Sequence, residues 1–252
     1  MAGLLGIGGG FVVVPILLLV LPRIGIEESL HAHFAIGTSL ACIVFTSLSS
    51  AYSHHRKKAV NWQLLKSMVP GLIIGAWLGA MLASVIKGPF LILIFVSGAL
   101  FTAYYLSRKH SLQTTNPTTS SWIYFLYAQF TGIVSALIGI GGGSVLVPFL
   151  VYRGQPMVKS VATAAACGFP IALFGSIGFV VSGWQAAKGI ENASGFIYWP
   201  AFISIVIFSS LSAPLGAKVA HFIQEKHLKQ AFSAFLILTS VQIIYSQWFS
   251  AV

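Results

Sequence analysis

Two glycine runs are the residues of this sequence best suited to binding a ligand. Both read Gly-Ile-Gly-Gly-Gly, at residues 6–10 (the first glycine run) and 139–143 (the second glycine run), and a proline stands five residues after each. Over the windows 4–18 and 137–151 the two segments agree at ten of fifteen positions. Because glycine disfavours a helix by about 1 kcal/mol per residue relative to alanine, each run predicts a helix break.

A helix break inside apolar sequence leaves backbone N–H groups without partners. Non-helical backbone at membrane depth persists only where it is buried in protein or lines a watery cavity. The first N–H groups of the restarting helix, with the positive end of that helix, form a site for an anion, and glycine allows close approach. The backbone groups predicted to bind substrate are those of Gly8, Gly9, Gly10, Gly141, Gly142 and Gly143.

Hydroxyl side chains are the second set of candidate ligands. Thr38 and Ser39 are adjacent, Thr163 occupies the place of Thr38 in a second matching segment, and Ser144 directly follows the second glycine run. The alternative for the threonines and Ser39 is a hydrogen bond to a carbonyl one helical turn back. Phe11 follows the first glycine run and cannot donate, so we expect the two copies to contribute unequally.

Glycine runs also serve proteins in two roles that involve no anion at a helix break. A dinucleotide-binding fingerprint needs a sixth-position glycine within a soluble βαβ unit, whereas Phe11 and Ser144 stand at that position in apolar sequence. This role is therefore excluded. Packing glycines that admit a neighbouring backbone remain an alternative to the anion site.

Composition places the chain in a membrane. Hydrophobic residues make up 57% of its 252 residues, charged residues 7%, and the mean hydropathy is +0.90, whereas a soluble domain carries about 25% charged residues. The net charge of +10 favours anionic lipid head groups and, in so apolar a chain, not nucleic acid. The four acids fall in or beside loops, so no carboxylate is expected at bilayer depth, where cation and proton carriers need one.

The elements that must position these residues are apolar helices, giving an all-α integral membrane protein. Apolar stretches near 20 residues long, without strand alternation, indicate spanning helices rather than a barrel. Residues 122–152 would extend about 46 Å as one helix, so we expect a break at the second glycine run. Gly71, Gly75 and Gly79 share one helix face and predict the close approach of another helix. The eight expected segments are about 3–22, 34–52, 64–86, 90–106, 122–152, 159–183, 196–222 and 230–249.

The repeats divide the chain into two related halves. Residues 35–42 match 160–167, with Thr and Cys in equivalent places, which predicts a first membrane repeat at 1–107, a polar linker at 108–121 and a second repeat at 122–252. Four crossings per half would make the repeats parallel, and a re-entrant segment at a glycine run would change that parity. The eight-helix arrangement puts seven Lys or Arg residues on each side, so the positive-inside rule gives no orientation.

These residues give the chain a resemblance to the TauE/SafE family of sulfite exporters and toluene sulfonate uptake permeases. The resemblance rests on the paired glycine runs with their prolines, on residues 37–39, and on the basic cluster at 54–58. It implies a multi-pass protein of the bacterial inner membrane that moves sulfite or another sulfur-containing anion, usually outward. One difference is that only residues 1–5 precede the first glycine run.

The sequence therefore predicts a secondary transporter that exports a small inorganic or organic sulfur anion. Import of an organosulfonate, a passive anion channel and a structural membrane subunit are the alternatives. The H-E-x-x-H, G-x-S-x-G and P-loop motifs are absent from the sequence, so we expect neither an enzyme nor an ATP-driven pump. No cofactor and no metal are expected; the lipid bilayer is a partner, and a homo-oligomer is left open.

Overall fold

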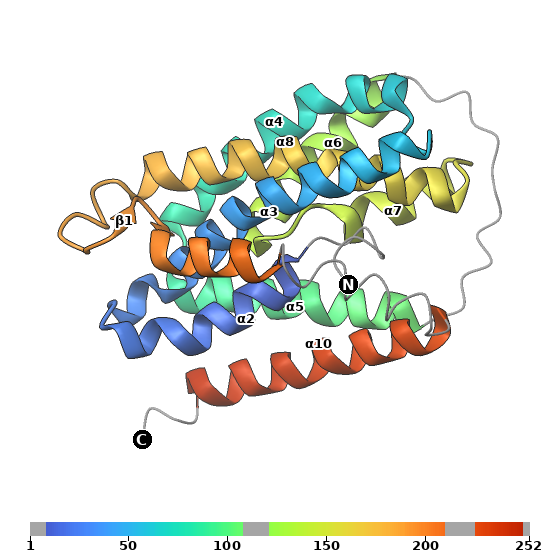
Figure 1. The fold of residues 1–252 in the computed structure, drawn as a ribbon. Helices are drawn as coiled ribbons and strands as arrows, with labels where there is room; N and C mark the ends of the chain where they lie inside the picture. The colour runs from blue at the N-terminus through green and yellow to red at the C-terminus, as the bar shows by residue number, and fades with distance from the viewer. Residues whose placement is uncertain (1–8, 108–120, 210–224, 249–252) are drawn as a thin grey trace.

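The computed structural model describes residues 9–107, 121–209 and 225–248, and these form a bundle of helices (Figure 1). The main helices are α2 (Gly10–Val20), α3 (His31–Arg56), α4 (Trp62–Val85), α5 (Gly88–Ser107), α6 (Ser121–Ile138), α7 (Gly143–Tyr152), α8 (Met157–Gly183) and α10 (Glu225–Trp248). An unlabelled apolar helix covers Trp199–Ser209. The short elements are the 3-10 helices η1 (Leu21–Ile24) and η2 (Glu28–Leu30) and the strands β1 (Ala193–Ser194) and β2 (Ile197–Tyr198).

Five of the described helices are long and apolar enough to cross a membrane: α3 with its leading 3-10 turn, α4, α5, α6 and α8. A multi-pass, all-α membrane protein is therefore confirmed, whereas the count of eight segments stays a prediction. The remaining apolar helices of the described ranges are shorter, and α7 has ten residues, about 15 Å or half of a hydrocarbon core. The break expected at Pro214 lies outside the described residues.

The second glycine run separates α6 from α7, as the sequence predicts. Helix α6 ends at Ile138 and α7 begins at Gly143. The Tyr127 ring of α6 stacks on the Phe149 ring of α7 with centroids 3.6 Å apart, and the Tyr127 hydroxyl donates to the Val145 carbonyl at 3.2 Å. Helix α7 therefore turns back along α6, and the two form a helical hairpin folded at the glycines.

Helices α3 and α8, which carry the second matching segment, are antiparallel. Gly37 lies against Phe179, Leu40 against Gly175, and Ser47 against Gly168, so residue numbers rise along one helix as they fall along the other. Figure 1 shows the same opposition in the short helices, because α2 and α7 extend from the middle of the bundle toward opposite ends. The equivalent segments thus run in opposite directions, the parity expected when a chain reverses at a glycine run.

The glycine face of α4 receives α6, as predicted. A Cβ on Gly71, Gly75 or Gly79 would collide with the backbone of α6 near residues 125, 129 and 133, respectively. Residue numbers rise together along the two helices, so α4 and α6 are parallel. Their close contact fixes the helix that leads into the second glycine run.

A small β-hairpin closes the bundle between α8 and the helix Trp199–Ser209. Ala193 pairs with Tyr198 and Ser194 with Ile197 around a two-residue turn, in which Gly195 has φ +53°. Phe196 at this turn is buried, and its ring contacts those of His33, Phe34 and Phe179. The sequence predicted only a hydrophilic loop at 184–195.

Candidate functional site

The two glycine runs meet in the interior of the protein. Gly10, the first residue of α2, packs directly on the backbone of Gly139 and Ile140, and a Cβ at Gly10 would collide with the Gly139 carbonyl. Gly9 caps α2 with φ −74° and is half-buried. Gly8 lies outside the described residues. Segments 130 residues apart in the chain thus form one contact, because glycine leaves no side chain between the two backbones.

The second glycine run leaves consecutive backbone donors unused. The N–H groups of Gly139 and Ile140 both donate to the Ser135 carbonyl, and those of Val145 and Leu146 both donate to the Gly142 carbonyl. Between them, the amides of residues 141–144 have no acceptor among the described residues. Gly142 caps α7 in the left-handed conformation with φ +76°, which turns this stretch of backbone away from the helical pattern.

These unused donors are buried. Gly141, Gly142 and Gly143 are all buried and Ser144 is half-buried, whereas more than about 90% of buried backbone N–H groups in proteins have a partner. The amides of residues 143 and 144 belong to the first turn of α7, where the helix dipole adds partial positive charge. The arrangement can bind an anion through backbone donors.

No cationic side chain supports this site within the described ranges. Every described Lys and Arg is exposed except Arg153, which is half-buried at the far end of α7. The described acids Glu27, Glu28 and Glu191 are exposed or lie in loops. The donors around the second glycine run are therefore all neutral.

The four predicted hydroxyl ligands lie in different surroundings. Ser39 is buried and donates to the Gly139 carbonyl at 2.9 Å, so it does lie at the second glycine run. Ser144, the second residue of α7, is half-buried beside it. Thr38 Oγ1 accepts the N–H of Tyr198 at 3.0 Å, and Thr163 Oγ1 accepts the N–H of Asn61 at 3.0 Å. The threonine oxygens thus join segments of different halves, and neither makes the bond one turn back.

Two side chains that the sequence did not single out pack at the break. The Cβ position of Gly142 lies 2.6 Å from Ile171 Cδ1 and 3.2 Å from Ser135 Oγ. Ile171 of α8 therefore closes the site on one side, and Ser135 brings a polar atom to it from α6. The available signal was that Ser135 precedes Gly139 by one helical turn, a spacing that directs its side chain toward the break.

His33 stands at the mouth of α3, where the sequence favours it among the histidines as a titrating gate. It is buried, and its Nε2 lies 3.1 Å from the carbonyl oxygens of both Ala83 and Ile86 at the end of α4. One N–H shared between the two carbonyls ties α3 to α4 at this end. Gating by His33 stays a prediction.

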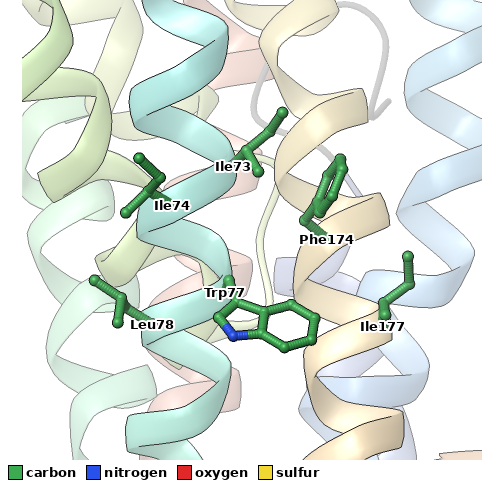
Figure 2. Close-up of a pocket in the computed structure, with 6 residues that line it drawn as sticks. All are labelled: Ile73, Ile74, Trp77, Leu78, Phe174 and Ile177. Atoms are coloured by element: carbon green, nitrogen blue, oxygen red, sulfur yellow. The ribbon is translucent and has the colours of Figure 1, made fainter.

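The groove in Figure 2 is a different feature from the glycine site. It has a volume of about 310 Å³ and lies between α4 and α8. Three of its residues, Ile74, Leu78 and Ile177, are at least 40% exposed, as expected for side chains that face lipid. The lining is apolar and unsuited to an anion: Ile73, Ile74, Trp77, Leu78, Phe174 and Ile177.

Comparisons with known proteins agree with this architecture. The chain is similar to probable membrane transporter proteins of Haemophilus influenzae (34% identity, 96% of this chain and 92% of the relative), Methanocaldococcus jannaschii (30%, 94% and 87%) and Bacillus subtilis (YunE; 30%, 98% and 93%). No solved structure matches significantly. The profile of the family described as sulfite exporter TauE/SafE matches residues 1–243. This chain is therefore a membrane transporter that belongs to the TauE/SafE family.

Proposed function

We propose that this protein is a secondary transporter that exports a small sulfur-containing anion, sulfite or an organosulfonate, across a bacterial inner membrane. The anion binds at the second glycine run, next to the first, and the two halves of the chain move around it. The observation that carries the proposal is the set of four consecutive amides at residues 141–144, without an acceptor among the described residues, at the start of α7.

The chemistry of the site supports an oxyanion. Sulfite and sulfonate groups present several oxygen acceptors on one centre, which suits a row of backbone N–H donors at a helix N-terminus. The family description names sulfite export, and the described acids lie away from the glycine runs. Import of an organosulfonate would use the same donors.

Substitutions at Ser144 separate the backbone donor from the hydroxyl. Proline is tolerated in the first turn of a helix, where its missing N–H has no intrahelical partner. Ser144→Pro therefore removes one proposed donor amide, whereas Ser144→Ala removes the hydroxyl alone. Val158→Pro is the matched control, because Val158 is likewise the second residue of its helix, α8, and is 71% exposed.

Sulfite efflux from proteoliposomes measures the effect. We expect Ser144→Pro to lower the efflux rate at limiting sulfite about tenfold or more, the loss that accompanies one hydrogen bond to a charged group. Val158→Pro should transport like the wild type. Wild-type efflux by Ser144→Pro would refute the anion site, and flux that rises linearly with sulfite without saturating would favour a channel.

A further inference from the structure

Ser135 is a buried polar side chain without a partner, aimed at the second glycine run. It is 0% exposed, and its Oγ has no hydrogen-bond partner in the part of the chain that the structure describes. The Oγ lies 3.2 Å from the Cβ position of Gly142, the residue that caps α7. A buried hydroxyl costs free energy unless it is hydrogen-bonded, so its unused donor needs an explanation.

Other buried hydroxyls on these helices bond to their own backbone. Thr131 Oγ1, one turn earlier on α6, donates to the Tyr127 carbonyl at 2.8 Å, and Ser176 Oγ on α8 donates to the Leu173 carbonyl at 2.9 Å. This local bond is the usual arrangement for Ser and Thr inside a helix. Ser135 departs from it at the position where α6 gives way to unpaired amides.

We propose that the Ser135 hydroxyl completes the anion site, and that this site selects monovalent oxyanions over divalent ones. The inference rests on the proposed function and adds to it both a ligand and a charge class of substrate. The described donors are the four amides of residues 141–144 and this hydroxyl. Bisulfite and alkylsulfonates fall within the class, and sulfate and fully ionised sulfite fall outside it.

The charge preference follows from the neutrality of the site. A helix N-terminus carries roughly half an elementary charge, which compensates much of one negative charge and little of a second. The cost of taking an ion out of water rises with the square of its charge, and a buried ion without a counter-charge is costly. No described Lys or Arg is buried to supply that counter-charge. Divalent anions therefore lose more on entering this site than monovalent ones.

Methanesulfonate and sulfate test both parts of the proposal, because they are similar in size and differ in charge. Their affinities are measured by titration calorimetry on the purified full-length protein in detergent at constant ionic strength. We expect wild type to bind methanesulfonate at least tenfold more tightly than sulfate, and Ser135→Ala to weaken methanesulfonate about tenfold. Ser240→Ala is the matched control, because Ser240 on α10 is also buried with an unpartnered Oγ, and its affinity should equal that of wild type.

The outcomes separate this proposal from the function on which it rests. Equal methanesulfonate affinity in wild type and Ser135→Ala would refute the role of Ser135, and sulfate binding as tight as methanesulfonate would refute the charge preference. Loss of sulfite efflux in Ser144→Pro would leave the proposed function standing in both cases. Ser135→Cys, a weak donor of similar size, should reproduce the loss of affinity if the alanine variant is unstable.

Discussion

At the scale of single residues, the two threonines have acquired a definite structural role. Thr38 of α3 accepts the N–H of Tyr198, and Thr163 of α8 accepts the N–H of Asn61. Each accepted amide directly precedes a Trp that begins a helix, Trp199 or Trp62. The bond therefore occurs twice, and each time it joins the halves that the sequence predicts.

Replacing either threonine with valine, which keeps its shape, should lower the melting temperature of the protein. Thr38→Val or Thr163→Val leaves a backbone N–H without its acceptor, a loss of about 1–3 kcal/mol when the group is buried. Thermal unfolding in detergent, followed by circular dichroism, measures this. Thr102→Val is the control, because Thr102 Oγ1 bonds only to the Gly98 carbonyl of its own helix. An unchanged melting temperature in both test variants would contradict the structural role.

Of the candidate site, the sequence predicted the backbone and not its neighbours. Glycine composition alone indicates a break, because its helix cost is local, and the break lies at residues 139–142. The partners of Thr38 and Thr163 lie 160 and 102 residues away, and a single sequence carries no signal for such pairs. Ser135 was missed because an unpaired hydroxyl becomes evident only once its surroundings are known.

At the scale of elements, glycine spacing predicted which helices pack closely. The four-residue spacing of Gly71, Gly75 and Gly79 marked one face of α4, and α6 occupies that face. The β-hairpin at residues 193–198 was missed because each strand has two residues, too few for an alternating pattern. Segment boundaries at 3–22 and 196–222 were also longer than the described helices α2 and Trp199–Ser209.

Alanine at Gly75 should separate α4 from α6. Its Cβ would meet the Gln129 carbonyl, Cα and backbone carbon, and backbone cannot move without shifting a helix. We expect overpacking of about 1–3 kcal/mol, seen as a lower melting temperature. Gly98→Ala is the comparison, because the atom nearest to its Cβ is the flexible end of Ile138. Equal effects of the two substitutions would argue against the close α4–α6 contact.

At the scale of the whole molecule, the reversal at the second glycine run redistributes charge between the two ends. The end where α3 finishes and α4, α6 and α8 begin carries six described cations: Arg56, Lys57, Lys58, Lys66, Arg153 and Lys159. The described charges of the opposite end are Arg23, Lys87, Lys188, Glu27, Glu28 and Glu191. The even split expected for eight straight crossings therefore disappears, and the positive-inside rule places the first end in the cytoplasm.

Cysteine labelling of intact cells tests this orientation. With Cys42 and Cys167 replaced by alanine, both being buried, a membrane-impermeant maleimide should modify Gln185→Cys from outside. Lys57→Cys and Gln155→Cys should react only after permeabilisation, because residues 57 and 155 flank the same end of α3 and α8. Labelling of residues 57 and 155 from opposite sides would disprove the reversal at the second glycine run.

The mirrored threonine bonds bear on the direction of transport. Because α3 and α8 are antiparallel, Thr38 and Thr163 lie toward opposite ends of the bundle, and each end is held by one hydrogen bond of the same type and length. Equal fastenings give inward-facing and outward-facing states similar energies, so the protein itself imposes no preferred direction. By microscopic reversibility the electrochemical gradient of the anion then sets the sign of the net flux, and export and import become one cycle run under different conditions.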